Sequence, residues 1–128
     1  MNNLERNDVA RISAVTGFLD RQSDSQNKRF VFAYTITIEN ISQVSFQLLS
    51  RHWLIQDANR KTEEVYGEGV VGETPVIQPG ESFTYTSGAV LETEMGTMEG
   101  RYFLRDELGN DFSVPIPKFV LSVPRVLH

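Results

Sequence analysis

The stretch from Phe30 to Ile38 alternates between large apolar side chains and smaller ones. One set is Phe30, Phe32, Tyr34, Ile36 and Ile38, and the other is Val31, Ala33, Thr35 and Thr37. A period of two residues, with β-branched and aromatic side chains, predicts a β-strand that lays one face on a core. No window of the sequence shows convincing helical periodicity. The chain is therefore expected to be all-β.

Further strands are predicted by the same pattern, each bounded by turn-forming residues. They cover about residues 9–18, 46–56, 61–66, 81–89, 98–105 and 111–114, with a last alternating segment at 119–123. Residues 20–28 contain no apolar side chain and are expected to form a solvated loop. Pro115 and Pro117 lack the amide hydrogen that a central strand needs, so they are predicted at an edge or a bulge.

Short strands separated by turns are typical of an immunoglobulin-like β-sandwich, here with about seven to eight antiparallel strands. The strand at 46–56 is apolar on both faces, with Leu49, Trp53 and Ile55 expected on one and Leu48, His52 and Leu54 on the other. Trp53 would then occupy the place of the core tryptophan of such sandwiches. Because the chain has no cysteine pair, the fibronectin type III type is favoured.

Length and composition indicate an ordinary globular protein. The 128 residues are expected to form a single domain, 1–128, with an ordered core at about 9–125 and a flexible segment at 1–8. A net charge of −5 weighs against nucleic acid as a partner, because phosphate backbones require clustered Lys and Arg. The sequence has no long apolar run, no signal-peptide pattern and no cysteine, so we expect a cytoplasmic protein without a membrane partner.

Residues 67–72 match the letters of the dinucleotide-binding fingerprint G-x-G-x-x-G. That fingerprint works when a strand precedes it and a helix opens after it, so that the helix N-terminus holds the pyrophosphate. Here Pro75, Pro79 and Gly80 follow and cannot continue a helix. Glu68 and Glu73 would also repel a phosphate. We interpret the segment as a turn or a partner-facing loop, with a phosphate cradle as the alternative.

A hydrolytic site would have to combine Ser50, His52 and Asp57. Two residues that are two apart on a strand lie roughly 6.5–7 Å apart, which is too far for an easy hydrogen bond between nucleophile and base. The sequence also lacks the G-x-S-x-G elbow. No catalytic residue is predicted, and the chain is not expected to be an enzyme.

The chain also has few residues that could bind a metal ion. A tight transition-metal site needs several His or Cys ligands, and the chain has only His52 and His128. Magnesium or calcium would have to use the glutamates of the middle region, which are Glu63, Glu64, Glu68 and Glu73. Glu63 and Glu64 are neighbours on a predicted strand and face opposite ways. No metal site and no cofactor are predicted.

Several segments resemble the ApaG family, also called CorD. They are Arg29 to Ile38, Arg51 to Ile55, Gly67 to Pro75, Tyr85 to Gly88, Pro115 to Pro117, Phe119, Leu121 and Val123-Pro124. The resemblance extends from about Ile12 to His128, with the segments in the family's order and spacing.

This resemblance implies a fibronectin type III-like β-sandwich in a small bacterial cytoplasmic protein. It also implies a link to cobalt and magnesium resistance, for which the family's molecular activity is not settled. Related domains in eukaryotic F-box proteins and in a DNA polymerase delta-interacting protein look like protein-interaction modules. The pyrophosphate motif attributed to the family maps onto Gly67, Gly69 and Gly72 here.

The function predicted from these observations is non-enzymatic binding of an unidentified protein partner. The expected surface combines the loop of Gly67, Glu68, Gly69, Val70, Val71, Gly72 and Glu73 with the flanking residues Arg51, His52 and Tyr66. The alternative is a small-ligand binder that takes a nucleotide or a divalent metal at this loop. A weak phosphate-ester hydrolase dependent on His52 or Glu68 ranks third. Pairing of edge strands leaves a weak homodimer open.

Overall fold

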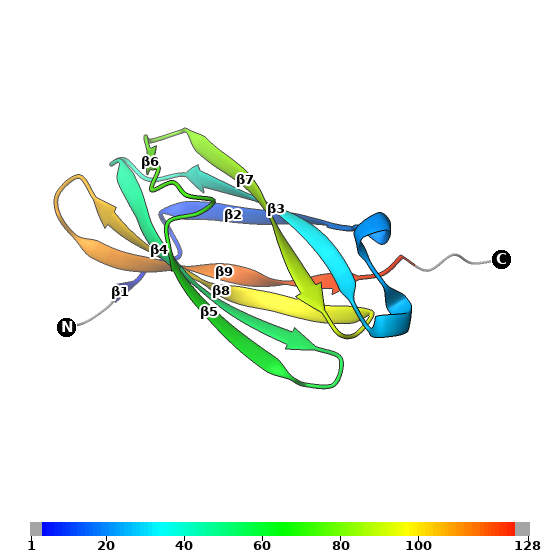
Figure 1. Ribbon diagram of the computed structural model, residues 1–128. Coiled ribbons are helices and arrows are strands. Elements are labelled where there is room, and N and C mark those ends of the chain that lie inside the picture. The colour runs from blue at the N-terminus through cyan, green and yellow to red at the C-terminus, as the bar shows by residue number, and fades with distance from the viewer. Residues whose placement is uncertain (1–3, 125–128) are drawn as a thin grey trace.

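Two β-sheets face each other in the computed structural model, which describes residues 4–124 (Figure 1). The smaller sheet has the order β2-β3-β7, formed by Ala10–Phe18, Phe30–Asn40 and Ser82–Leu91. The larger sheet has the order β1-β9-β8-β4-β5, formed by Leu4–Glu5, Asp111–Ser122, Met95–Asp106, Phe46–Asp57 and Thr62–Glu68. The short strand β6, Val76–Ile77, pairs with the start of β4. This arrangement confirms the all-β sandwich of fibronectin type III type.

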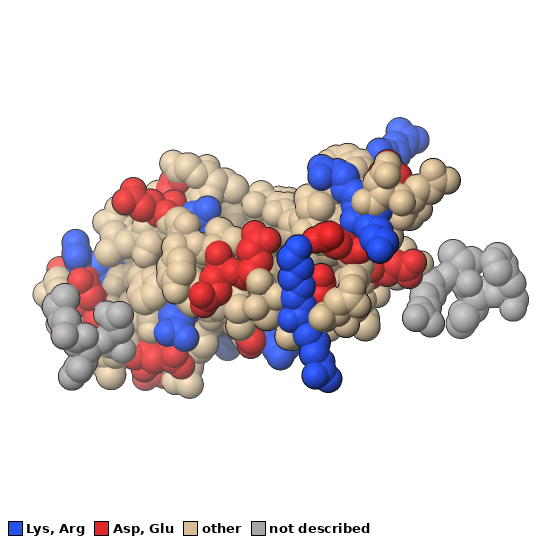
Figure 2. All heavy atoms as spheres, turned by 60° about the horizontal axis from the view of Figure 1, so that its bottom comes forward, with Lys and Arg blue, Asp and Glu red and all other residues tan. Residues whose placement is uncertain are grey.

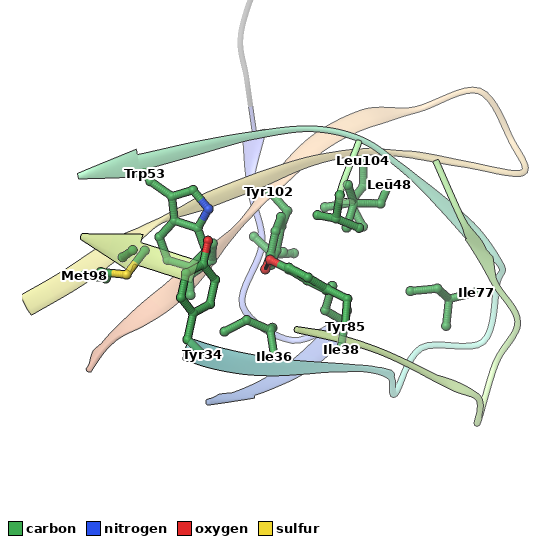
Figure 3. Packing of buried hydrophobic residues seen from close by; sticks show 14 of the residues in the cluster. Tyr34, Ile36, Ile38, Leu48, Trp53, Ile77, Tyr85, Met98, Tyr102 and Leu104 are labelled. Atoms are coloured by element: carbon green, nitrogen blue, oxygen red, sulfur yellow. Dashed lines mark hydrogen bonds between the residues drawn. The ribbon is translucent and has the colours of Figure 1, made fainter. Parts of the chain in front are cut away.

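The core lies between the sheets and contains the residues that the alternating pattern selected. Phe30, Phe32, Tyr34, Ile36 and Ile38 of β3 are all buried. Trp53 of β4 is 2% exposed, and its ring meets that of Tyr34 edge-on at 5.5 Å between centroids (Figure 3). The placement of Trp53 in the core of the sandwich is confirmed.

The expected faces of β4 were wrong at one end because of a β-bulge. Leu48 pairs with Leu104 and Ser50 pairs with Phe103, so Leu49 is an extra residue opposite the same strand. An extra residue shifts by one position the side chains that face the core beyond the bulge. Leu48 and Trp53 therefore both point into the core, although the uninterrupted pattern placed them on opposite faces.

The N-terminal segment differs from the prediction of a flexible tail at residues 1–8. Leu4 and Glu5 form β1 and pair in parallel with Phe112 and Ser113 of β9. The amide of Arg6 donates to the Ser113 carbonyl at 2.7 Å, and its guanidinium lies over the Phe112 ring. These contacts join distant parts of the chain, which a local pattern does not reveal. Residues 1–3 lie outside the described part of the structure.

Two further predicted segments differ in detail from the structure. The expected loop at 20–28 contains two short 3₁₀ turns, η1 at Asp20–Gln22 and η2 at Ser25–Asn27. The two segments predicted at 111–114 and 119–123 belong to one continuous strand, β9. Pro117 lies at a bulge of this strand, between the Gly100–Ile116 and Met98–Phe119 pairs, as its missing amide hydrogen predicts.

The two sides of the sandwich close differently. On one side β2 meets β9, and the Thr16 hydroxyl donates to the Val120 carbonyl at 3.4 Å. On the other side a hollow of about 360 Å³ opens between β5 and β7, with Val65 and Ser87 among its lining residues. Among residues 4–124, no helix is long and apolar enough to span a membrane.

Candidate functional site

The glycine motif is a tight β-turn rather than a phosphate loop. Val70 and Glu73 exchange two backbone hydrogen bonds, of 2.8 and 2.9 Å. The two residues between them, Val71 and Gly72, have φ angles of 43° and 81°. Two central residues with positive φ define a type I′ hairpin turn. The next element is the short strand β6, so no helix follows the motif.

Three backbone amides of this turn, those of Gly69, Val70 and Glu73, already have acceptors. The amide of Gly69 donates to the Leu49 carbonyl at 2.8 Å, and those of Val70 and Glu73 donate to each other's carbonyls. Gly69 has a φ of 61°, and a Cβ there would collide with the Glu73 carbonyl oxygen. A phosphate cradle needs several amides that point outward. The glycines at 69 and 72 are therefore explained by the turn itself.

The glycine at position 67 has a different explanation, which is the position of Arg51 on the neighbouring strand. The two residues are paired across β4 and β5, and a Cβ at Gly67 would lie 2.6 Å from the guanidinium carbon of Arg51. Arg51 Nη1 donates to the carbonyls of Glu68 and Gly69, at 3.0 and 2.7 Å. The guanidinium thus lies flat on Gly67 and is held by the backbone at the start of the turn.

Arg51 lines the hollow between the two sheets, which we call the inter-sheet hollow. Its walls include Tyr34, Trp53, Ser87 and Glu63. Within residues 4–124, no carboxylate lies within 4.0 Å of the Arg51 guanidinium, whereas six other ion pairs form on the surface. A half-buried positive charge therefore borders the hollow without an acidic partner among the described residues.

Two tyrosines lie behind Arg51 in the core. The hydroxyls of Tyr85 and Tyr102 hydrogen-bond to each other (Figure 3). Burial raises the pKa of Tyr85 to about 12, and it raises the pKa of Tyr102 well above its ordinary value. Arg51 is paired with Tyr102 across β4 and β8, and its positive charge opposes the rise of both pKa values.

The opposite face of the same hairpin carries a second group, which we call the outer patch. It consists of His52, Tyr66, Ser50, Phe103 and Glu68. The rings of His52 and Tyr66 stack in parallel, with centroids 4.1 Å apart and an interplanar angle of 3°. Tyr66 is nevertheless 68% exposed. His52 Nε2 lies 3.2 Å from Glu64 Oε1, which anchors the imidazole on the strand surface.

The structure thus divides the predicted recognition surface in two. Arg51 lines the inter-sheet hollow and also borders the outer patch at its pair Gly67, while His52, Tyr66 and Glu68 face outward. Adjacent residues on a strand point to opposite faces, so Arg51 and His52 belong to different environments. Val70 is fully buried, and Val71 at the tip of the turn is 52% exposed.

The residues considered for hydrolysis are not assembled. No hydrogen bond joins Ser50 to His52, and the partner of His52 is Glu64. The Asp57 carboxylate accepts the amides of Asn59 and Lys61, at 2.8 and 2.9 Å, and so caps the β4–β5 turn. These contacts give Asp57 a structural role.

The glutamates do not gather into a metal site in the described part of the chain. Residues 4–124 contain no group of three or more His, Asp or Glu placed to hold one ion. Glu63 lines the inter-sheet hollow and Glu64 contacts His52, so the two neighbours face opposite ways as predicted. His128 lies outside the described residues.

The surface charge is mixed. Figure 2 shows acidic side chains spread over the middle of one face, with basic ones between them and at the end near the C-terminal residues. Several of these charges are paired, such as Lys61 with Glu92 and Arg105 with Asp111. This face has no continuous basic patch of the kind that tracks a nucleic-acid backbone.

Sequence reasoning missed the inter-sheet hollow and the role of Arg51 in it. One signal was available, namely the turn at residues 57–60. Counting outward from the pair formed by Asp57 and Lys61 brings Arg51 opposite Gly67. A glycine across from an arginine at a strand end indicates that the longer side chain lies over it.

Comparison with known proteins identifies close relatives over nearly the whole chain. The family model described as "ApaG domain" matches residues 20–106. "Protein ApaG" of Thiobacillus denitrificans is 56% identical over 117 residues, which cover 91% of this chain and 92% of the relative. "Protein ApaG" of Nitrosomonas eutropha is 51% identical over 128 residues and the full length of both chains. These names state no activity.

A solved structure agrees with the fold. The crystal structure of a putative ApaA protein from Bordetella pertussis superposes with a TM-score of 0.88 and 44% identity. The match covers 91% of this chain and 95% of that one.

Proposed function

The chain belongs to the ApaG family, and from this premise we propose that it is a non-enzymatic module that binds another protein. The binding surface is the outer patch of the larger sheet, extended by the exposed tip of the glycine turn at Val71. The family resemblance implies the bacterial cytoplasm as the setting. The cobalt and magnesium phenotype linked to the family would then arise through the partner.

The observation that supports this proposal best is the exposed but immobilised ring of Tyr66. Its side chain is 68% exposed and yet stacks on His52, which Glu64 holds in place. Binding energy at protein interfaces is concentrated in tyrosine, tryptophan and arginine anchors. A ring that is already ordered loses little conformational entropy when a partner covers it. Tyr66 thus has the properties of an interface anchor.

The tip of the turn supports the same surface. Val71 is β-branched, has a φ of 43° and leaves half of its side chain in solvent. A β-branched residue in the left-handed region is strained, and such strain concentrates at functional positions. The exposed side chain makes few contacts within the chain that would offset the strain. A partner that packs on the exposed side chain of Val71 would provide contacts that offset this strain.

The alternative of a nucleotide or a metal at Gly67–Gly72 has no comparable support. The amides of Gly69, Val70 and Glu73 donate within the protein, and Glu68 and Glu73 carry negative charge beside the turn. A two-dimensional amide NMR titration with ATP and magnesium tests this alternative. Saturable shifts centred on residues 67–72 would establish it, and their absence at millimolar ligand is expected.

Photo-crosslinking in cells tests the protein-binding proposal. A photoreactive phenylalanine analogue at position 66 is compared with the same analogue at Val15, which is 72% exposed on β2 of the opposite sheet. Escherichia coli is a suitable host because its own relative is 51% identical. A discrete adduct is expected from position 66 alone.

Competition gives the control for this experiment. Excess wild-type chain should abolish the adduct, and the Tyr66→Ala chain should compete at least about thirtyfold less well, since loss of an interface anchor costs about 2 kcal/mol or more. Identical adducts from positions 66 and 15, or equal competition by both chains, would refute the outer patch as the binding surface. A pair of crosslinked copies of this chain would instead indicate the homodimer through edge strands, for which β2, β5 and β7 each leave one long edge unpaired in the described structure.

A further inference from the structure

The inter-sheet hollow is large enough for a small molecule. Its volume is about 360 Å³, within the range of roughly 300–1,000 Å³ typical of ligand pockets. It lies on the side of the sandwich where β5 and β7 are not joined, so it opens to solvent between two strand edges. Its location on the inner face of β4 and β5 separates it from the outer patch.

The walls combine apolar and aromatic side chains with polar groups, and the polar groups make up the larger share of the exposed lining. Val65 and Met98 contribute apolar side chains, and Tyr34 and Trp53 contribute aromatic rings. Ser87 adds a hydroxyl from β7. In pockets that bind organic molecules, apolar and aromatic walls pack the body of the ligand and polar groups set its orientation.

The Arg51 guanidinium places a positive charge at the hollow, so a ligand there is expected to carry a negative charge. It lines the hollow, lies flat on Gly67 and is fixed by the carbonyls of Glu68 and Gly69. No carboxylate in residues 4–124 pairs with it. Both bonds to carbonyls come from one nitrogen, Nη1, so Nη2 and Nε keep donors for another acceptor. A planar guanidinium recognises carboxylates by two parallel hydrogen bonds.

Trp53 supplies a second donor that the protein does not use. Its side chain is 2% exposed, and the indole Nε1 has no hydrogen-bond partner among residues 4–124. Buried donors without an acceptor are rare in native proteins and need an explanation. Figure 3 shows this nitrogen turned toward the hydroxyl end of Tyr34, whose ring also lines the hollow.

We propose that the inter-sheet hollow binds a small organic monocarboxylate with an apolar body. The carboxylate pairs with the Arg51 guanidinium and accepts from the Trp53 indole N–H. The apolar body packs on Val65 and Met98. This site lies outside the glycine turn, whose part is to hold Arg51 in place.

The position of Glu63 limits the ligand further. Glu63 pairs with Ile55, four residues along β4 from Arg51, which corresponds to about 13 Å at 3.3 Å per residue. A negative charge at that end of the hollow disfavours dicarboxylates. The distal end of the ligand is therefore neutral or positively charged.

The single tryptophan of the chain provides a direct readout. Hydrocinnamate serves as the probe, and hydrocinnamide is its uncharged control with the same apolar body. The indole ¹⁵N–¹H resonance and the tryptophan fluorescence of the full chain are followed during titration. Hydrocinnamate is expected to move the indole proton resonance downfield in a saturable way, and to bind about tenfold more tightly than the amide.

Two charge-removing variants separate Arg51 from a general effect of charge. Arg51→Gln should weaken hydrocinnamate binding about tenfold. Arg101→Gln, at an exposed position on the outer face of β8, should leave it unchanged. Dispersed amide spectra establish that both variants are folded. Equal binding of probe and control, an Arg51→Gln variant that binds like wild type, or no saturable shift at millimolar probe would each overturn the proposal.

A second pair of variants leaves Arg51 intact. Glu63→Gln should tighten hydrocinnamate binding about twofold, because it removes a screened repulsion inside the hollow. Glu64→Gln, on the neighbouring residue but the opposite face, should have no effect. Equal effects of the two variants would contradict the assigned position of the ligand. None of these outcomes depends on the outer patch, so this proposal and the protein-binding proposal fail independently.

Discussion

The two faces of the β4–β5 hairpin differ in burial, in charge and in contact with solvent. The inner face places Arg51 and Trp53 against the hollow and the core, where charges and donors are partly removed from water. The outer face places His52 and Tyr66 in a stacked pair, in which the tyrosine is 68% exposed and the histidine side chain is 16% exposed. A step of one residue, from His52 to Trp53, moves from one environment to the other. Neighbours in sequence on a strand are therefore poor candidates for a common site.

The same contrast explains the three glycines of the motif. Gly67 belongs to the inner face because it makes room for the Arg51 guanidinium. Gly69 and Gly72 belong to the turn because their φ angles are positive. The three glycines that match a nucleotide fingerprint thus have two local causes, neither of which requires a phosphate. The comparison of the two faces can be tested by substitutions on each side.

The largest expected difference is between the neighbours Trp53 and His52. Trp53→Ala removes a fully buried aromatic side chain and should lower the free energy of unfolding by about 3–5 kcal/mol. His52→Ala removes a ring on the solvent-facing side and should cost less than about 1 kcal/mol. Urea unfolding followed by circular dichroism measures both, since Trp53→Ala removes the only tryptophan. A His52→Ala variant as unstable as Trp53→Ala would refute the contrast.

Alkaline pH should lower the stability of the chain through the buried tyrosine Tyr85 of β7. The pKa of Tyr85 is raised to about 12 in the folded chain, whereas an unfolded tyrosine titrates near 10. Between these values the unfolded chain binds fewer protons than the folded one, so stability falls as the pH rises from 10 through 12. A shift of two pKa units corresponds to a loss of roughly 2–3 kcal/mol.

Variants of the tyrosines check this pH dependence. The double variant Tyr85→Phe/Tyr102→Phe should show a clearly shallower decline of stability above pH 10, measured by urea unfolding at a series of pH values. Tyr66→Phe, which alters the exposed tyrosine of the outer patch, should follow the wild-type curve. A Tyr66→Phe variant that flattens the curve, or a double variant that does not, would contradict the assignment to the buried pair.

A smaller and opposite effect is expected at the tip of the turn. Val71→Asn places a residue that tolerates the left-handed region at a φ of 43° and should stabilise the chain by about 1 kcal/mol. Val76→Asn, an exposed valine of β6 outside the positive-φ positions, should not stabilise it. Thermal unfolding compares the two. If both variants behaved alike, backbone strain at Val71 would not be the cause.

The smallest effect on stability should come from Gly67→Ala. The new Cβ would displace the end of a flexible arginine rather than the backbone, so the cost should be at most about 1 kcal/mol. The displaced guanidinium should nevertheless weaken hydrocinnamate binding at the hollow, as Arg51→Gln does. Gly17→Ala, where a Cβ meets nothing within 4 Å, is the control and should leave binding unchanged. Unchanged binding in Gly67→Ala would remove the link between the motif and Arg51.

Much of the fold could be predicted because its signals are local. The alternation of Phe30 to Ile38 and the turn at residues 57–60 each depend on a few neighbouring residues, and the structure confirms both. The bulge at Leu49 could not be predicted, since nothing in the apolar run at 46–56 marks the extra residue. The pairing of Leu4 with Phe112 joins segments more than 100 residues apart and leaves no periodic trace.

The candidate site was predicted less completely. Residues 67–73 were recognised as a turn, and Tyr66 as a flanking aromatic, from turn chemistry and composition. Arg51 and His52 were assigned to one surface, because the pattern did not show that Arg51 turns inward. Arginine is usually solvent-exposed, and its half-buried place here depends on a glycine sixteen positions away.

The sequence by itself determined most of the long strands of this protein, several of its turns and its sandwich class, because period-two alternation and turn chemistry are properties of adjacent residues. Only the tertiary structure decided that the two sheets close along β2 and β9 and stay apart between β5 and β7. That separation depends on how side chains from four or five strands fill the space between the sheets. It leaves Arg51 without an acidic partner in the described residues and Trp53 with a free donor, at the edge of the same hollow.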